Sequence, residues 1–170
     1  VGFKNGTYGT TKIAVDAINA ATRPHHFLSI RKDGGNAAIV STQGNSDTHI
    51  ILRGGKEPNY DAIHIDKVSE ELKTANLPTK IMVDLSHANS RKDHNAQIEV
   101  GNVIAKQITN GDNRIIGVMI ESHLISGRQD VKPDHELIYG QSITDACLGW
   151  ENTVTLIESL AKASRLRKVN

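Results

Sequence analysis

Residues 81–90, IMVDLSHANS, restrict the folds open to this chain more than any other segment does. The segment begins with an apolar run, Ile81–Val83, and turns polar from Asp84 onward. A buried parallel strand that delivers side chains to a site has this form, with apolar residues in the sheet and polar residues at its carboxyl end. The alternative is a strand that leads into a helix, with Asn89 or Ser90 as the N-cap. Recurrence of the pattern along the chain favours the first interpretation.

Strand-like and helix-like segments alternate along the chain. Short apolar strands are predicted at residues 1–4, 49–52, 81–83 and 115–120. Helices with one apolar face are predicted at about residues 10–21, 61–75 and 93–108, and a last one begins with Asn152 or Thr153 as its cap. A hairpin is predicted at about residues 27–42, because two strand-like segments there are joined by a short connection with two glycines. This order predicts an α/β fold with a parallel sheet and right-handed crossovers.

The C-terminal part of the chain contains a less regular segment before its last helix. Residues 124–140 are polar with little periodicity, which predicts a long loop, and long loops inside compact domains are often functional. In the last helix, the apolar residues expected to face the core are Val154, Ile157, Leu160 and Ala161.

Composition and charge exclude several classes of protein. A chain of 170 residues, 38% hydrophobic and 23% charged, suits one globular domain of ordinary size. Its net charge of +1 provides no global field to attract nucleic acid or a membrane surface, and no apolar run approaches the roughly 20 residues of a membrane span. The single cysteine, Cys147, excludes an internal disulfide framework and fits a reducing compartment, and the first residues lack the apolar region of a signal peptide. We therefore expect a cytoplasmic protein.

Each of the four principal predicted strands ends in a polar residue that could take part in chemistry. These residues are Lys4, Arg53, His87 and Glu121, and a fifth, Asp145, precedes the last helix. One charged residue at a strand end is common. Four in succession are difficult to explain as a solvated surface, because the loops that follow the strands of a βα barrel converge on one face.

Lys4 and Arg53 form the first of two chemically distinct sets. Both are cations suited to a phosphate or a carboxylate, since Arg53 offers a planar fork of donors and Lys4 a compact charge. Gly54 and Gly55, directly after Arg53, would let the backbone approach a ligand closely. The alternative is that Arg53 pairs with a carboxylate such as Asp84 and that the glycines only form a turn.

His87, Glu121 and Asp145 form the second set, which offers one imidazole and two carboxylates to a divalent cation. Such a set suits manganese, iron, cobalt or zinc and does not choose among them. The three residues lie far apart in the sequence, so they do not form a local ligand motif. The alternatives are a hydrogen-bonded core histidine at position 87 and a helix cap at position 145. The chain lacks phosphate-loop, dinucleotide-binding and nucleophile-elbow signatures.

Six segments of the chain closely resemble class I 3-deoxy-D-arabino-heptulosonate 7-phosphate (DAHP) synthase, the amino-acid-regulated microbial form. They are GFKNGT at 2–7, PHHFLSI at 24–30, HIILRGGKEPNYDA at 49–62, VDLSHANS at 83–90, IIGVMIESHL at 115–124 and YGQSITDACLGWE at 139–151. They follow one another in the family's order and span essentially the whole chain, which makes the resemblance more specific than any short motif.

The resemblance implies a metal-dependent enzyme of the shikimate pathway and of aromatic amino acid biosynthesis. Members of the family condense phosphoenolpyruvate with erythrose 4-phosphate and water to give DAHP and phosphate, on a (β/α)8 barrel that binds a divalent metal. By resemblance, Lys4 and Arg53 hold phosphoenolpyruvate. His87, Glu121 and Asp145 are three of the four metal ligands. Lys4 and His87 are the expected catalytic residues, and His87 and Asp145 are also expected to contact substrate.

The resemblance also implies regulation by an aromatic amino acid effector. The family's effector site involves the hairpin at about residues 27–42, in which Phe27, Ser29 and Val40 are candidate lining residues. The sequence RKDGGN at 31–36 departs from the family pattern, and we infer one inserted residue there. With one residue inserted, the positions of the family's effector pocket do not align residue by residue with this part of the chain.

The length of the chain fits only part of this fold. A complete (β/α)8 domain needs about 250 residues, so residues 1–170 are expected to form the C-terminal half of the barrel, strands five to eight with their helices, plus the inserted hairpin. By resemblance, the first half of the barrel provides the fourth metal ligand, a cysteine, and most of the other phosphate-binding cations. A half barrel exposes strand edges. We therefore expect a fragment, inactive alone, whose edges are covered by the missing N-terminal half or in a homo-oligomer, a dimer or a tetramer.

Two other functions fit some of the same residues. The chain could be a non-catalytic phosphate-binding or assembly module that keeps Lys4 and Arg53 as an anion site, and anion binding without metal or turnover would identify it. It could also be a different metal aldolase on a related barrel, which would fail to accept phosphoenolpyruvate.

Overall fold

A computed structural model describes residues 1–133 and 136–167 of the chain, and its centre is a four-stranded parallel sheet. The strands lie in the order β1 (Gly2–Lys4), β4 (His49–Leu52), β5 (Ile81–Asp84) and β6 (Ile115–Met119). All three neighbouring pairs in this sheet are parallel. The predicted α/β fold with a parallel sheet is therefore confirmed.

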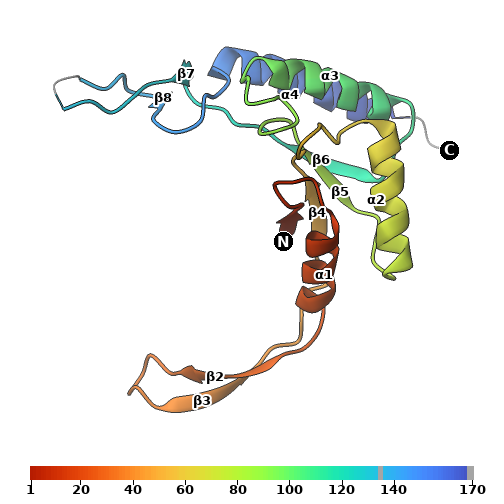
Figure 1. The fold of residues 1–170 in the computed structure, drawn as a ribbon, viewed down its shortest axis with the longest axis vertical. Helices are drawn as coiled ribbons and strands as arrows, with labels where there is room; N and C mark the ends of the chain where they lie inside the picture. Colours follow the sequence, from red (N-terminus) through yellow and green to blue (C-terminus); the bar gives the residue numbers. More distant parts are fainter. Residues whose placement is uncertain (134–135, 168–170) are drawn as a thin grey trace.

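Four helices connect and follow these strands, and they lie along one side of the sheet in Figure 1. They are α1 (Lys12–Ala21), α2 (Ala62–Thr74), α3 (Ala96–Thr109) and α4 (Trp150–Arg165). The helices and the sheet enclose an aliphatic core that includes Ile50, Leu52, Ile65, Leu72, Ile81, Val83, Leu85, Ile104, Ile115 and Leu156. Each such side chain contributes about 1.5–3 kcal/mol of transfer free energy when fully buried. The helices of the described residues are each too short or too polar to span a membrane.

The sequence explains where α2 begins and which of its faces is buried. The side chain of Asp61 accepts a hydrogen bond from the backbone N–H of His64, which satisfies one of the free donors at the helix start. Ile65, Val68 and Leu72 then recur at helical spacing, and all three are buried against the sheet. The helix thus has the cap and the apolar stripe that its sequence predicts.

Helix α4 follows the prediction only in part. Leu160 packs against the core as predicted, but the start of the helix and the exposure of Ile157 differ from the prediction. The helix begins at Trp150 with Gly149 at the N-cap position, so neither Asn152 nor Thr153 caps it. Leu156 is 2% exposed, whereas Ile157, predicted to face the core, is 48% exposed. The cause is the packing of α4 on α3, where a Cβ atom at Gly101 would lie 2.5 Å from Cδ1 of Leu156. The missing side chain of Gly101 lets Leu156 enter the α3–α4 interface.

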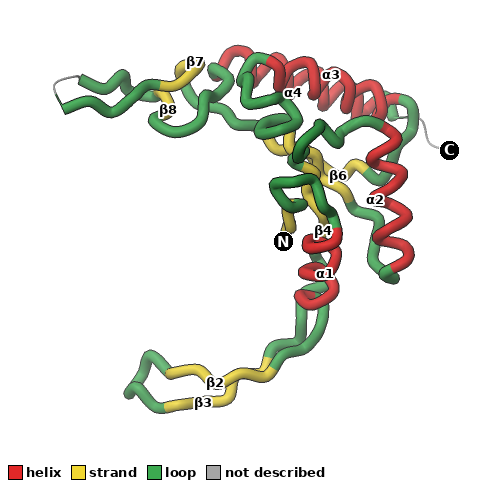
Figure 2. Tube along the Cα trace, viewed as in Figure 1, coloured by secondary structure: helices red, strands yellow, loops and turns green. Residues whose placement is uncertain are grey.

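A hairpin leaves the body of the protein between α1 and β4. Its strands β2 (His26–Ile30) and β3 (Ala37–Ser41) pair in antiparallel register, and Figures 1 and 2 show the hairpin projecting far from the sheet. Gly34 and Gly35 have positive φ angles in its turn, as short hairpin connections require. The predicted hairpin is confirmed. Its apolar side chains are largely exposed: Phe27, Leu28, Ile30, Ile39 and Val40.

The segment predicted as one long loop, residues 124–140, contains a short strand. In it, β7 (Ile125–Arg128) pairs in parallel with β8 (Gln141–Ser142). The side chain of Gln129 also binds the backbone of Ile138 in both directions, accepting from its N–H and donating to its C=O. A pairing this short leaves no periodic pattern in the sequence, so the prediction of an unpaired loop was wrong here.

We expect Leu156→Ala to destabilise the chain much more than Ile157→Ala does. Truncation of the buried Leu156 leaves a cavity at the α3–α4 interface and should lower the free energy of unfolding by about 2–5 kcal/mol. Ile157 is the matched control, because it lies on the open face of the same helix. Urea unfolding of both variants of the 170-residue chain measures the two losses. A larger loss for Ile157→Ala would contradict the observed rotation of α4.

Candidate functional site

The polar residues at the strand ends come together at one edge of the sheet. Lys4 ends β1 and His87 follows β5. Glu121 follows β6, and Asp145 lies in the loop before α4. The carboxyl ends of parallel strands share an edge, and in open and closed α/β folds this edge carries the ligand site. The convergence expected from the sequence is therefore present.

His87, Glu121 and Asp145 are arranged as metal ligands. One ligand atom from each lies within 4.8 Å of the others, and Nε2 of His87 is 3.5 Å from Oε1 of Glu121. A cavity of about 30 Å³, large enough to hold a water molecule, lies between these residues and is also lined by Lys92 and His94. One imidazole and two carboxylates form a donor set that divalent transition metals accept. The residues therefore fit a divalent cation.

The charge of the cluster also favours a cation. Burial raises the pKa of the Glu121 carboxyl above its ordinary value. His87 and Lys4 act to lower it, while the carboxylates of Asp145 and Asp84 act to raise it further. Glu121 and Asp145 line the small cavity, and the carboxylate of Asp84 lies behind the third ligand, His87. A bound divalent cation would relieve their repulsion.

Asp84, the last residue of β5, is fully buried beside this cluster. Its carboxylate forms an ion pair with the ammonium of Lys4 at 2.9 Å and lies 2.8 Å from Nδ1 of His87. Burial acts to raise the pKa of Asp84, but hydrogen bonds from Ser86 and Lys4 and the charge of His87 outweigh it, so the net pKa is lowered. The sequence analysis considered Asp84 as a partner of Arg53, and the structure pairs it with Lys4 instead.

The loop after β5 has an unusual backbone. His87, Arg91 and Lys92 all have φ between 53° and 62°, a left-handed conformation that costs energy for residues other than glycine. The loop is closed by a hydrogen bond from the N–H of Lys92 to the carbonyl of His87. Neither Asn89 nor Ser90 caps a helix, because α3 begins only at Ala96 with Asn95 at its N-cap. The alternative interpretation of a strand leading directly into a helix is wrong.

Three buried asparagines, Asn5, Asn59 and Asn89, tie the strand ends together, and of these only Asn89 was singled out from the sequence, as a helix cap. Oδ1 of Asn5 accepts from the backbone N–H of Arg53, and its side-chain amide donates to the carbonyl of Gly54. Oδ1 of Asn59 accepts from the N–H of Gly54, and Oδ1 of Asn89 accepts from the N–H of Asn59. Each asparagine follows a strand or a turn glycine in the sequence, but nothing there shows that these amides are buried. They fix the backbone around Arg53.

Arg53 has an unused donor. Its Nε is buried and has no hydrogen-bond partner among the described residues. A buried donor without a partner is costly, and a planar guanidinium is suited to phosphate and carboxylate oxygens. A Cβ atom at Gly54 would lie 2.8 Å from the backbone N of Asn89, and its φ is +75°, so only glycine fits there. Arg53 and its surroundings form a candidate anion site.

The candidate effector residues lie on the hairpin. Phe27 and Val40 are directly opposite each other in the β2–β3 register. Ser29 is two residues from Phe27, so all three side chains share one face of the hairpin. Figure 1 shows the β2–β3 hairpin well away from the carboxyl ends of the sheet strands. The structure thus places the three residues together but not in the metal and anion site.

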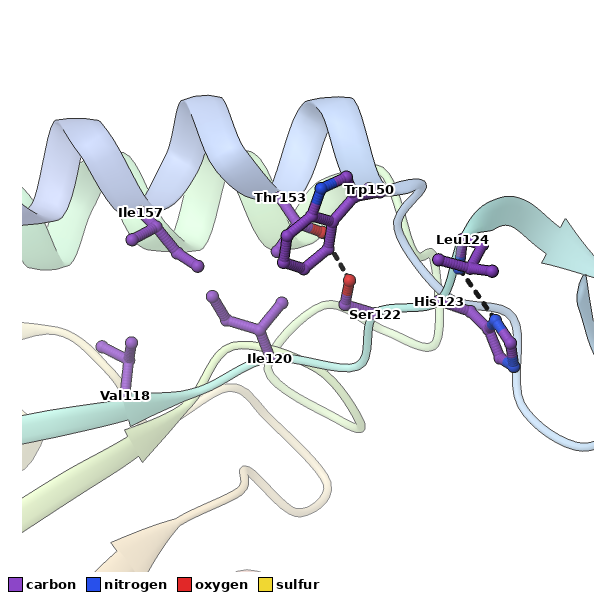
Figure 3. Close-up of a pocket in the computed structure, with 8 residues that line it drawn as sticks. All are labelled: Val118, Ile120, Ser122, His123, Leu124, Trp150, Thr153 and Ile157. Carbon is purple, nitrogen blue, oxygen red and sulfur yellow. Dashed lines mark hydrogen bonds between the residues drawn. The ribbon is translucent and has the colours of Figure 1, made fainter. Parts of the chain in front are cut away.

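A larger cavity, of about 640 Å³, is lined by none of the three metal ligands and is mainly apolar (Figure 3). Figure 3 shows Val118 and Ile120 facing Trp150 and Ile157 of α4 across it. It borders β6, which pairs only with β5 among the described strands. This groove offers no set of metal ligands, and we assign it no chemistry. It is an uncovered part of the helix–sheet interface.

Comparisons with known proteins agree on one family. The sequence profile of the DAHP synthetase I family matches residues 1–158. The chain is 55% identical over 168 residues to the Phe-sensitive phospho-2-dehydro-3-deoxyheptonate aldolase of Escherichia coli K12, covering 99% of this chain and 48% of that protein. It is 54% identical over 175 residues to a tyrosine-inhibited relative from Schizosaccharomyces pombe, covering 100% of this chain and 47% of that protein.

A solved structure shows the same arrangement of the backbone. The phospho-2-dehydro-3-deoxyheptonate aldolase of Francisella tularensis SCHU S4 superposes with a TM-score of 0.91 at 49% identity, covering 99% of this chain and 49% of that one. The chain thus spans about half the length of the relatives it matches.

We expect Glu121→Gln to weaken Mn²⁺ binding strongly, because it removes the negative charge of a metal ligand. Loss of a residue that only hydrogen-bonds to a ligand typically weakens metal binding about 10- to 100-fold, and the effect here should be larger. Glu99→Gln, on the exposed face of α3, is the matched control and should leave binding unchanged. Titration of each variant with Mn²⁺ by calorimetry or electron paramagnetic resonance measures the affinity. Equal affinities of Glu121→Gln and the unsubstituted chain would contradict the assigned ligand set.

Proposed function

The chain belongs to the DAHP synthetase I family, and we propose that it forms about half of an enzyme that condenses phosphoenolpyruvate with erythrose 4-phosphate and water to give DAHP and phosphate. The observation that carries the proposal is the meeting of His87, Glu121 and Asp145 with Lys4 at the carboxyl edge of a parallel sheet. The relatives are named as aldolases of this product, and several are named as sensitive to or inhibited by an aromatic amino acid.

We propose that residues 1–170 form strands five to eight of a (β/α)8 barrel. Four parallel strands, each followed by a helix, are half of such a barrel. Among the described strands, β1 and β6 each have one neighbour, so two edges remain open. The apolar groove beside β6 supports the same proposal, since its side chains would be covered by the rest of the barrel. The remaining half would provide further ligands and cations.

Arg53 and Lys4 would hold phosphoenolpyruvate. The guanidinium of Arg53 can bind two oxygens of a phosphate or carboxylate at once, and the Lys4 ammonium adds a charge on the side nearest the metal ligands. These cations would offset the repulsion between the two phosphorylated substrates and hold phosphoenolpyruvate with its C3 carbon toward the aldehyde. Addition of water at C2 and loss of phosphate complete the balance of the reaction.

His87, Glu121 and Asp145 would hold the divalent cation beside this anion site. When bound there, the cation would polarise the aldehyde oxygen of the sugar phosphate as a Lewis acid. Asp145 is exposed, unlike the other two ligands, so its carboxylate can also contact the sugar. This donor set accepts manganese, iron, cobalt or zinc, so the metal that is bound would depend on which of them is available.

The β2–β3 hairpin would serve regulation. Phe27, Ser29 and Val40 share a face, and Phe27 and Val40 are partly exposed apolar side chains. An aromatic ring could pack on this face, with Ser29 as a polar contact. We therefore propose the hairpin as part of an aromatic amino acid site that other parts of the protein complete.

We expect the 170-residue chain to form no DAHP alone and to do so when joined to the complementary half of the Escherichia coli Phe-sensitive relative. The missing half would close the barrel and complete the site. Consumption of phosphoenolpyruvate with erythrose 4-phosphate and added Mn²⁺ measures turnover. His87→Ala should abolish it, whereas His64→Ala, on the surface of α2, should not.

Two results would contradict this account. Turnover by the isolated chain near the rate of the joined protein would refute the half-barrel proposal. Binding of phosphoenolpyruvate by the joined protein without any turnover would favour a non-catalytic phosphate-binding module.

We expect Arg53→Lys to raise KM for phosphoenolpyruvate in the joined protein by about 10- to 100-fold. A lysine cannot reproduce the planar fork, and a charge-assisted hydrogen bond contributes about 1.5–3 kcal/mol. Arg23→Lys, at an exposed position after α1, controls for the substitution itself. Steady-state kinetics with varied phosphoenolpyruvate measure the effect, and an unchanged KM would remove Arg53 from the anion site.

A further inference from the structure

Asp84 contacts both parts of the site at once. Its Oδ2 lies 2.9 Å from the Lys4 ammonium and 2.8 Å from Nδ1 of His87. Its Oδ1 accepts from the backbone N–H and from the hydroxyl of Ser86. The carboxylate is fully buried at the end of β5, three residues before His87. Neither substrate nor metal is assigned to it in the proposed reaction.

These contacts determine which nitrogen of His87 carries its proton. The Lys4 ammonium can only donate, so Oδ2 of Asp84 is an acceptor. The single hydroxyl hydrogen of Ser86 is donated to Oδ1 of Asp84, so the Ser86 oxygen, 2.8 Å from Nδ1 of His87, also presents a lone pair. Nδ1 therefore faces two acceptors and holds the proton. Nε2 faces the carboxylate of Glu121 at 3.5 Å and is the nitrogen on the side of the metal ligands.

We propose that Asp84 is a positioning residue that fixes the Nδ1–H tautomer of His87 and, through the same oxygen, the place of the Lys4 ammonium. This inference rests on the proposed function, because it assigns His87 to the metal and Lys4 to phosphoenolpyruvate. A metal-binding histidine usually donates its second N–H to a carboxylate or carbonyl, which fixes its orientation. Here that carboxylate also holds the anion-binding cation, so one group sets the relative positions of the two subsites.

The substitution Asp84→Asn would change the hydrogen bonds to His87 and Lys4 while leaving the packing of the side chain almost unchanged. Its shape is almost unchanged, but only one of its two terminal atoms accepts hydrogen bonds. If the amide oxygen keeps the bond from the Ser86 N–H, the NH₂ group faces Lys4 and Nδ1 of His87. The imidazole then accepts at Nδ1 and carries its proton on Nε2, the atom needed for the metal. The opposite orientation places the amide NH₂ against the Ser86 N–H.

The tautomer of His87 in the metal-free 170-residue chain is the direct test. Long-range ¹H–¹⁵N correlation spectra distinguish a proton on Nδ1 from one on Nε2, and His87→Gln identifies the signals of this histidine. We expect Nδ1–H in the unsubstituted chain and a shift toward Nε2–H in Asp84→Asn. The first result does not depend on Asp84→Asn, so it stands even if that variant folds poorly.

Mn²⁺ affinity provides the second readout. Asp84→Asn should weaken Mn²⁺ binding by about 10- to 100-fold. The matched control is Asp112→Asn, because Asp112 is also a partly buried carboxylate, paired with Arg114 at 2.7 Å just before β6, at the opposite end of that strand from the site. It should lower thermal stability without changing Mn²⁺ affinity or the His87 tautomer.

The outcomes separate this inference from the function on which it rests. An Nε2–H tautomer in the unsubstituted chain, or Mn²⁺ affinity unchanged in Asp84→Asn, would overturn the positioning role and leave the proposed function intact. Failure of the unsubstituted chain to bind Mn²⁺ through His87 would count against the proposed metal site itself. The expected shift and loss, absent in Asp112→Asn, would support Asp84 as the residue that joins the two subsites.

Discussion

The parallel register of the central sheet is the constraint on which the site depends. Lys4 pairs with Ile51, and Val83 pairs with Leu52 on one side and with Val118 on the other. The strands therefore end nearly level, and the polar residues that follow them emerge at one edge. A shift of one residue in any pair would turn alternate side chains to the other face. The buried asparagines then hold the loops at this edge in place.

The same edge explains why charged groups can be buried here. A lone buried carboxylate is costly, but Asp84 is surrounded by donors from Ser86, Lys4 and His87. Its contacts link β1 and β5, although β4 lies between them in the sheet. The apolar groove beside β6 and the exposed hairpin show the opposite condition, apolar surface without a cover. The chain spans about half the length of its relatives, so uncovered apolar surfaces such as the groove and the hairpin are expected.

Much of the fold could be predicted from the sequence, because the strands of the central sheet are apolar runs and the helices have apolar residues at helical spacing. The sequence also identified the strand-end residues, since Lys4, Arg53 and Glu121 directly follow apolar runs and His87 lies in the polar segment after another. It could not give the burial of Leu156 in α4, because the room for this side chain comes from Gly101 of another helix. The sequence also could not show that Asp84 pairs with Lys4, because this ion pair joins two strands that are far apart in the sequence.

The most direct test of the account is anomalous diffraction from crystals of the joined protein containing Mn²⁺ and phosphoenolpyruvate. The account predicts one manganese peak bonded to Nε2 of His87 and to the carboxylates of Glu121 and Asp145. It also predicts phosphoenolpyruvate on Arg53 and Lys4, with Nδ1 of His87 on Asp84. Manganese bound elsewhere, or bound through Nδ1 of His87, would contradict it.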